Sequence, residues 1–160
     1  FMGNEFGQGT EWNHNLALPW FLLDFEKHRG ISQLFRDLNH TYQRCKPLYE
    51  LDHQGAGFAW IDHQDADHST LSFKRYDSQG DVIYVVSNFT PVPRIGFDLE
   101  VEQAGDYEII LNTDSSYYWG SNFDVGMAKA AHQQHGQGHW VLQLDLPPLS
   151  TLYLRRRVMA

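Results

Sequence analysis

Short stretches in which every second residue is apolar dominate the chain after Pro47, and this pattern constrains its fold more than any other feature. Residues 97–101 and 140–146 alternate in this way, so each would present one apolar face as a β-strand. Strands are predicted at residues 57–61, 70–76, 82–89, 97–101, 107–112, 140–146 and 151–154. Strands of this length, separated by turn residues at this spacing, predict an antiparallel β-sandwich of Greek-key type.

Turn residues and prolines separate these stretches. The sequence SQGD at 78–81 predicts a hairpin turn, while the prolines at 91, 93, 147 and 148 would end strands or protect sheet edges. Residues 113–138 are rich in glycine and polar side chains, so they predict one long surface loop.

The segment before Pro47 has a different pattern. Residues 1–7 are predicted to form a short buried strand that runs into a glycine turn and then a loop. One helix is predicted between Gly30 and Pro47, because apolar residues recur there at helical spacing. Its stripe consists of Ile31, Leu34, Phe35, Leu38, Tyr42 and Cys45. A strand, a loop and one helix form a β/α unit without neighbours.

Charge and chain chemistry exclude several classes of protein. A net charge of −8 opposes binding to nucleic acid phosphates, and no apolar run approaches the roughly 18 residues of a membrane span. The single cysteine, Cys45, cannot form a disulfide within the chain, which is typical of the reducing cytoplasm. Because Phe1 is not an initiator and residues 1–6 lack the features of a secretory signal, we expect the chain to begin inside a longer one.

Two clusters that resemble metal sites are interpreted as loops. His132, His135 and His139 could share a helical face, but glycine and glutamine surround them and a structural zinc ion needs four ligands. The acidic residues and histidines at 62–68 lack the glycine and terminal glutamate of an EF-hand, so we interpret them as a hairpin loop. We therefore expect no metal ion and no cofactor.

Polar and aromatic residues after the first predicted strand form the candidate binding site. In a (β/α)8 barrel, the loop that follows a strand leaves from the face that carries the active site. The residues that would line such a cleft rim are Glu5, Glu11, Trp12, Asn13 and His14. Trp12 is the candidate for ligand contact, and Trp20 is the candidate for packing. Glu5 has two interpretations of equal weight, a cleft carboxylate or a structural carboxylate that orients the neighbouring loops through hydrogen bonds.

Seven short segments along the chain carry a resemblance to a known family. They are FMGNEFGQ at 1–8, EWNH at 11–14, YELD at 49–52, GFAW at 57–60, SNFTPVPR at 87–94, LNTDS at 111–115 and LPPLS at 146–150. In this order they resemble bacterial glycogen branching enzymes of the α-amylase superfamily. The first two segments are similar to the last barrel strand of that family and the loop after it, and the other five to its C-terminal β-sandwich. The chain departs from the family mainly at residues 132–139.

The resemblance implies a division of the chain and a reaction for its parent protein. Residues 1–48 would be the last strand, loop and helix of a truncated catalytic (β/α)8 barrel, and residues 49–160 would be the C-terminal all-β domain. The parent would cleave α-1,4-glucan chains by a retaining double displacement. It would transfer the cut chain to a glucose 6-hydroxyl, which forms the α-1,6 branches of glycogen.

The resemblance also implies that the chemistry lies outside this chain. The nucleophilic aspartate, the acid/base glutamate and the stabilising aspartate of the family would lie on earlier barrel strands, and none matches a residue here. We therefore expect no catalytic residue and no activity in these 160 residues alone. The expected partners are an α-glucan (glycogen or amylose), the missing N-terminal barrel of the same chain and a second copy of the fragment. The expected location is the cytoplasm.

Two other functions stay open. The parent could be another amylase relative, such as a debranching or trehalose-releasing enzyme. The chain could instead be a glucan-binding β-sandwich module, with Tyr117, Tyr118 and Trp119 as an exposed aromatic platform. The alternative for these three residues is the buried end of a strand.

Overall fold

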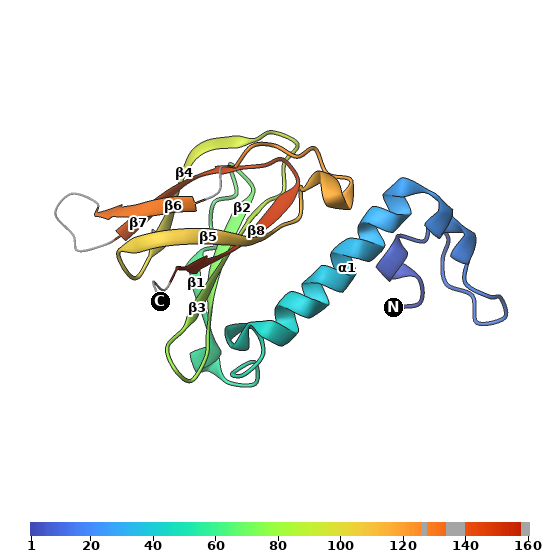
Figure 1. Ribbon diagram of the computed structural model, residues 1–160, viewed down its shortest axis with the longest axis horizontal. Coiled ribbons are helices and arrows are strands. Elements are labelled where there is room, and N and C mark those ends of the chain that lie inside the picture. Colours follow the sequence, from blue (N-terminus) through green and yellow to red (C-terminus); the bar gives the residue numbers. More distant parts are fainter. Residues whose placement is uncertain (126–127, 134–139, 158–160) are drawn as a thin grey trace.

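Two β-layers and one helix make up the regular structure of residues 1–125, 128–133 and 140–157, which the computed structural model describes (Figure 1). The helix α1 covers Glu26–Arg44, and it leads from the N-terminal segment to the sandwich. The strands are β1 (Phe58–Asp62), β2 (Thr70–Tyr76), β3 (Val82–Asn88), β4 (Arg94–Val101), β5 (Gly105–Asn112), β6 (Ala128–Gln133), β7 (Trp140–Leu146) and β8 (Ser150–Arg156). Short 3-10 helices are η1 (Asn4–Phe6), η2 (Trp20–Asp24), η3 (Lys46–Leu48), η4 (Gly55–Gly57) and η5 (Ser116–Tyr118).

Neighbouring strands are antiparallel, in the order β1-β2-β3-β8-β5-β6-β7-β4. β6 pairs with β5 at residues 128–131 and with β7 at residues 132–133, so it passes from one layer to the other. The order β8-β5-β6-β7 is that of a Greek key. The predicted antiparallel β-sandwich is confirmed, and the seven predicted strands form with ends shifted by three residues or fewer.

The main core lies between the two layers. Its buried side chains are Tyr84, Val86, Leu99, Val101, Tyr107, Leu142, Leu144, Leu146, Leu152 and Leu154. The apolar faces predicted for residues 97–101 and 140–146 therefore point inward. A second cluster, with Leu48, Ile83 and Val85, lies on the opposite face of β3, next to η3. Because β3 is buried on both faces, its sequence reads as a nearly continuous apolar run.

The strand predicted for the N-terminus is wrong. Residues 1–3 are irregular, and the 3-10 helix η1 follows them. Gly3 and Gly7 flank η1 with φ angles of 98° and 66°, left-handed conformations that interrupt an extended chain. No strand in the described part of the chain pairs with these residues. An extended segment without a hydrogen-bonding neighbour would leave its backbone groups unpaired, and these residues form local turns instead.

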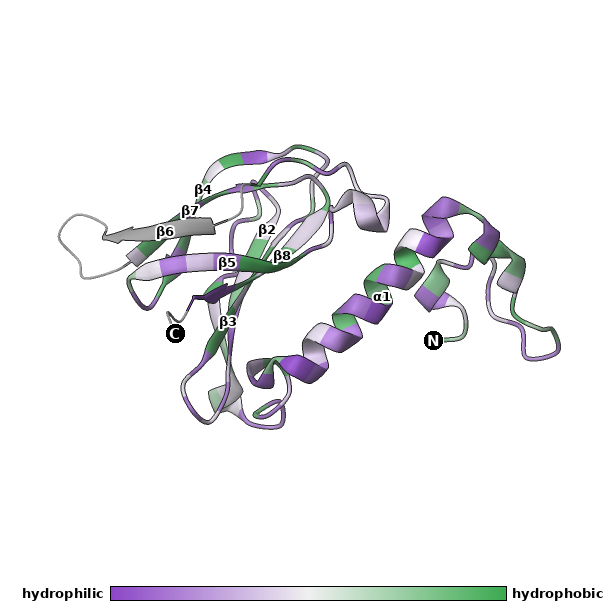
Figure 2. Cartoon of the chain, in the orientation of Figure 1, coloured by the Kyte–Doolittle hydropathy of each residue, from purple (hydrophilic) through white to green (hydrophobic). Residues whose placement is uncertain are grey.

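The helix begins earlier than its apolar stripe predicts. α1 starts at Glu26, and Gly30 lies inside it instead of preceding it. Figure 2 shows hydrophobic and hydrophilic residues alternating along α1, as expected for an amphipathic helix. No helix in the described ranges is both long and apolar enough to cross a bilayer.

The long loop predicted at residues 113–138 contains regular structure. It begins with η5, and the strand β6 follows at Ala128–Gln133. The sequence AKAAHQ has low β-propensity, so only pairing with β5 and β7 makes it a strand. His132 belongs to β6, while His135 and His139 lie outside the described residues.

Candidate functional site

The residues predicted for the cleft rim lie beyond the N-terminal end of α1, away from the sandwich (Figure 1). Glu11, Trp12, Asn13 and His14 are exposed, and Glu5 is half-buried in η1. The four exposed residues lie in the loop that connects η1 with η2, and the Asn15 amide donates a hydrogen bond of 2.9 Å to Asn13 Oδ1, which closes a local turn in this loop.

Trp12 is the centre of an exposed aromatic cluster. Its side chain is 41% exposed, and its ring packs edge-on against Phe1 at a centroid distance of 5.2 Å. The imidazole of His14 lies 6.1 Å from the Trp12 ring at a tilt of 52°. Phe1 is 76% exposed and was not singled out from the sequence. An exposed indole with aromatic neighbours can stack on the apolar face of a sugar ring.

Glu5 stabilises the turn in which it lies. One of its carboxylate oxygens, Oε2, accepts a hydrogen bond of 3.0 Å from the Gly3 amide. A Cβ on Gly3 would lie 2.7 Å from the Gln8 Oε1 atom, so this left-handed position requires glycine. The contact matches the structural role of Glu5 left open by the sequence, and it is local to η1.

The two 3-10 helices that flank the loop are fastened to the first turns of α1. Phe6 is 1% exposed and packs on Trp20 at a centroid distance of 5.1 Å. His28 Nδ1 lies 2.8 Å from the Phe6 carbonyl oxygen, and Arg29 donates a hydrogen bond of 2.7 Å to the Asp24 carbonyl. Trp20 packs on Phe6, but it is 56% exposed against 41% for Trp12, so burial does not separate the residue predicted for packing from the residue predicted for ligand contact.

The aromatic turn η5 contacts α1 and is not the buried end of a strand. Tyr117 is 66% exposed and Trp119 is 52% exposed. The Tyr118 hydroxyl donates a hydrogen bond of 2.8 Å to Asp37 Oδ2, and burial together with this carboxylate raises the pKa of Tyr118. Lys27 Nζ lies 4.2 Å from the centre of the Trp119 ring, a cation–π distance. Two of the three candidate platform residues therefore contact the helix.

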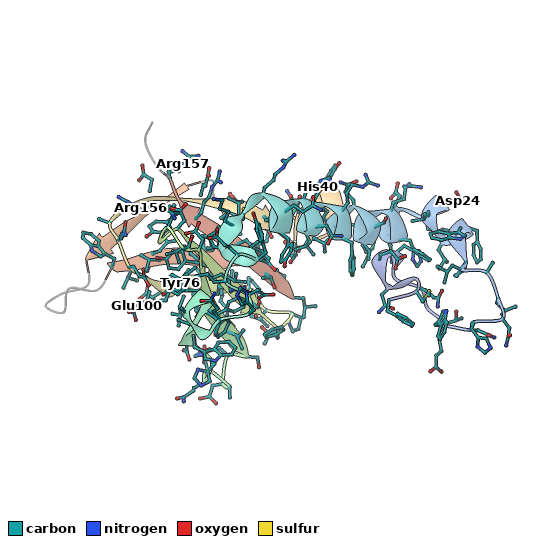
Figure 3. All side chains as sticks on the ribbon, turned by 90° about the horizontal axis from the view of Figure 1, so that it is seen from below. Asp24, His40, Tyr76, Glu100, Arg156 and Arg157 are labelled. Carbon is teal, nitrogen blue, oxygen red and sulfur yellow. The ribbon has the colours of Figure 1, made fainter. Side chains whose placement is uncertain are left out.

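A cleft of about 880 Å³ lies at the other end of α1, beside β5 and β8. Figure 3 shows Arg156 and Arg157 at this end of the molecule and Asp24 at the far end. Arg155 and Arg157 both pair with Glu108, at 2.6 Å and 3.4 Å, and the Arg155 hydrogen bond lowers the pKa of Glu108. Burial raises the pKa of the Cys45 thiol in this cleft, which makes the thiol less nucleophilic. The groups form an ion-pair network and do not combine a nucleophile with a base.

The acidic loop at residues 62–68 connects β1 with β2, as predicted. Asp65 accepts hydrogen bonds of 2.6 Å from both the Thr70 hydroxyl and His68 Nδ1, and the Thr70 contact is the main reason that the pKa of Asp65 is lowered. Within the described ranges, no three histidine, cysteine or acidic side chains are grouped so that they could hold a metal ion.

Comparison with known proteins relates the sandwich and the N-terminal segment to one family. The family model "Alpha amylase, C-terminal all-beta domain" matches residues 60–157. The "1,4-alpha-glucan branching enzyme GlgB" of Pseudoalteromonas atlantica is 47% identical over 156 residues, which are 96% of this chain and 21% of that protein. The chain thus spans about a fifth of the length of this relative.

A solved structure shares the fold. The crystal structure of an alpha-amylase from H. orenii aligns with a TM-score of 0.51 at 15% sequence identity, and it covers 79% of this chain and 20% of the other. At this identity the match concerns the architecture alone.

Proposed function

The chain belongs to the family of alpha-amylase C-terminal all-beta domains, and on this premise we propose that it is the C-terminal part of a 1,4-α-glucan branching enzyme. The observation that carries the proposal is the extent of the similarity to the branching enzyme GlgB. It covers 96% of the chain, and therefore includes α1 and most of the N-terminal segment that the family model leaves unmatched. A sandwich shared by many amylase relatives would not by itself favour branching.

The proposed reaction belongs to the whole parent protein. The parent cleaves an α-1,4-glucan and transfers the cut chain to a 6-hydroxyl of another glucan, which adds branches to glycogen. Its catalytic carboxylates lie on a barrel outside this chain, and residues 1–48 are the last unit of that barrel. The partners of the chain are thus the barrel and an α-glucan, and the proposed location is the cytoplasm.

The proposed part of this chain in substrate binding is the cleft rim formed by Glu5, Glu11, Trp12, Asn13 and His14. Its support is the exposed aromatic cluster around Trp12, beside polar side chains that can bond to sugar hydroxyls. The proposed role of Glu5 is to hold the backbone at Gly3, through its 3.0 Å hydrogen bond, below the loop.

An assay of the full-length protein that contains this chain tests the proposed function. Amylose is incubated with the purified protein, and the iodine spectrum, reducing ends and released oligosaccharides are followed together. A branching enzyme lowers the iodine absorbance while the number of reducing ends stays nearly constant, because each cleavage is followed by a transfer. Reducing ends released from a branched glucan would instead identify a debranching enzyme, and free trehalose a trehalose-releasing one. Binding without either product would identify a glucan-binding module.

A further inference from the structure

The turn at residues 114–123, here called the Asp114 turn, is built around one buried carboxylate. Asp114 is 7% exposed, and its Oδ1 accepts a hydrogen bond of 2.8 Å from the Ser121 amide. Its Oδ2 accepts from the Ser121 hydroxyl at 2.8 Å and from the Phe123 amide at 2.9 Å. A Cβ on Gly120 would lie 2.1 Å from the Asp114 carbonyl oxygen. Because these contacts all lie within the turn, its shape is set locally, and it projects from the end of β5 as a rigid element.

The Asp114 turn meets one face of α1 at three points. A Cβ on Gly30 would lie 2.5 Å from the Tyr118 carbonyl oxygen, so the helix and the turn touch through their backbones. The Tyr118 hydroxyl donates to Asp37 Oδ2 at 2.8 Å, and Lys27 Nζ lies 4.2 Å from the centre of the Trp119 ring. Positions 27, 30 and 37 share a helical face. A backbone contact, a hydrogen bond and a cation–π contact together define how the helix meets the turn.

Two further residues in the first turns of α1, His28 and Arg29, contact the N-terminal segment. His28 Nδ1 lies 2.8 Å from the Phe6 carbonyl oxygen, which belongs to η1. Arg29 donates to the Leu23 and Asp24 carbonyls at 3.3 Å and 2.7 Å, which fastens η2. Consecutive residues 27–30 therefore contact the Asp114 turn on one side and both ends of the Trp12 loop on the other.

We propose that the Asp114 turn is a positioning element that sets the place of the Trp12 loop through residues 27–30 of α1. Lys27, Gly30, Asp37 and Tyr118 are its positioning residues, and none of them is required to touch glucan. In this arrangement the β-sandwich orients a substrate-binding loop that lies at the far end of α1. The consequence for glucan binding rests on the proposed function, whereas the mechanical link does not.

Hydrogen–deuterium exchange on the 160-residue chain tests the link directly. The variant is Gly30→Ala, and the matched control is Gly55→Ala, where nothing lies within 4 Å of the added Cβ. Alanine usually stabilises a helix interior relative to glycine, so a loss of protection would report the contact with Tyr118. We expect amides of residues 1–44 to exchange about ten-fold faster in Gly30→Ala and amides of β3 and β8 to keep their protection. Unchanged exchange in residues 1–44 would overturn the proposal.

If Gly30→Ala fails to fold, variants of the Tyr118–Asp37 hydrogen bond test the same link with a smaller perturbation. Tyr118→Phe removes the donor and keeps the ring, so it should raise exchange in residues 1–44 in the same direction. Asp37→Ala should do so as well, whereas Asp37→Asn keeps an amide oxygen as acceptor and should restore most of the protection. Equal exchange in Asp37→Ala and Asp37→Asn would show that the hydrogen bond positions nothing.

Kinetics of the full-length protein test the consequence for glucan. We expect Tyr118→Phe to raise the KM for amylose about three-fold or more with a smaller change in kcat, because the loop that it positions contributes binding. A wild-type protein without branching activity would refute the proposed function, and the exchange experiment would still decide whether the turn positions the loop. A branching enzyme in which Tyr118→Phe raises exchange but leaves KM unchanged would overturn the consequence for glucan binding, while the raised exchange would still support the mechanical link.

Discussion

Asn88 is a buried side chain on which four hydrogen bonds converge. The residue is 1% exposed. Its Nδ2 donates hydrogen bonds to the Val92 carbonyl at 2.8 Å and to the Pro147 carbonyl at 2.9 Å. Its Oδ1 accepts hydrogen bonds from the Thr90 amide at 3.0 Å and from the Thr90 hydroxyl at 2.8 Å. The amide thus uses both donors and both lone pairs. It ties the two proline-containing turns of the sandwich to the end of β3.

Replacing Asn88 by alanine should therefore destabilise the fold strongly. The change removes four hydrogen bonds and leaves the Thr90 amide without this acceptor, whereas the Val92 and Pro147 carbonyls keep hydrogen bonds from the Thr90 and Ser150 hydroxyls. Because a buried group without its partner costs roughly 1–3 kcal/mol, we expect the free energy of unfolding to fall by about 2 kcal/mol. Urea unfolding measures it, with exposed Asn39→Ala on α1 as the control, which should change stability by no more than about 0.5 kcal/mol. Equal midpoints for the two variants would contradict this account of Asn88.

Trp12 is the residue on which the proposed glucan contact depends. In the full-length protein, Trp12→Ala should raise the KM for amylose about five-fold, because loss of a stacking face removes roughly 1 kcal/mol of binding. The melting temperature of the Trp12→Ala variant should stay within about two degrees of the wild-type value, because Trp12 is 41% exposed. Leu16→Ala, in the same loop and 70% exposed, is the control and should leave KM unchanged. Large unfolding with normal kinetics in the surviving fraction would make Trp12 a packing residue.

At the scale of elements, the sequence predicts strands where one face is apolar and misses them where pairing alone makes the strand. β4 carries Phe97, Leu99 and Val101 at alternate positions, and β7 carries leucines at 142, 144 and 146, so their period identifies them. β6 carries alanines and polar residues, and its backbone pairing is invisible in the sequence. The strand predicted at residues 1–7 is wrong for a different reason, because Gly3 and Gly7 adopt left-handed φ angles that interrupt an extended chain. Gly30 was predicted to precede the helix, and its place inside α1 is explained by the close backbone contact with Tyr118.

The strand β7 contributes three leucines to the main core of the sandwich. Leu142 is 0% exposed and lies in the main core, so Leu142→Ala should cost about 2–5 kcal/mol by lost burial and a residual cavity. Leu149→Ala, just after β7 and 69% exposed, is the matched control. Denaturant midpoints compare the two. A small effect at Leu142 would mean that the layers repack around the cavity.

A polar network connects β2 with the residue after β4. Glu102 Oε1 accepts from Lys74 Nζ at 2.9 Å and from the Tyr76 hydroxyl at 2.6 Å. Burial alone would raise the pKa of Glu102, but these two hydrogen bonds outweigh it and lower the pKa. Burial alone would likewise lower the pKa of Lys74, and its bonds to Glu102 and Tyr76 outweigh that effect and raise it.

The stabilisation from this network should therefore be limited by pH on both sides. The contribution of Glu102 is present above its unfolded pKa of about 4.3 and is lost as pH falls through its lower folded value. The contribution of Lys74 is present below its unfolded pKa of about 10.4 and is lost as pH rises through its higher folded value. Thermal unfolding of Glu102→Gln should show a lower Tm than the wild type at pH 7 and a smaller difference at pH 3. Glu11→Gln removes the same charge from an exposed loop and is the control for net charge. A difference in Tm between Glu102→Gln and the wild type that is the same at pH 7 and pH 3 would refute the link between the Glu102 pKa and stability.

For the whole molecule, α1 separates two regions of different character (Figure 1). The sandwich contains two buried apolar clusters, although it also exposes large apolar residues such as Phe89 and Ile95. Among residues 1–44, Phe6 is the only large apolar residue that is buried. The exposed side chains there and on α1 include Phe1 at 76%, Phe21 at 64%, Phe25 at 56%, Phe35 at 40% and Tyr42 at 46%. η1 packs on α1 and covers part of its apolar stripe near Ile31. Self-association of the chain through the remaining apolar surface stays a prediction.

The division between the two regions explains why the sequence predicts the sandwich better than the candidate site. A sandwich closes on its own core, so its pattern contains the information needed to place its strands. The position of Trp12 depends on contacts at Gly30, His28 and Tyr118 that link distant parts of the chain. Such contacts leave no periodic signal, and only the residue types of the cleft rim were predictable.

The 160-residue chain by itself should have no branching or hydrolytic activity on amylose. Retaining glycoside chemistry needs a nucleophilic carboxylate and an acid/base carboxyl about 5–5.5 Å apart, on either side of the scissile bond. The carboxylates of the cleft rim are Glu5, which is engaged with the Gly3 amide, and Glu11, which lies in an exposed loop. Neither position provides the fixed, water-excluding geometry that the displacement requires.

The measurement incubates the purified chain with amylose and follows reducing ends and the iodine spectrum, with the full-length protein as the positive control. Both signals should stay at the level of buffer for the chain, because binding through Trp12 alone stabilises no transition state. Glu5→Gln should behave in the same way, since it changes a carboxylate that accepts one local hydrogen bond. An enzyme-level loss of iodine colour that persists through purification and vanishes in Glu5→Gln would instead place the active site in these residues and make Glu5 a catalytic carboxylate.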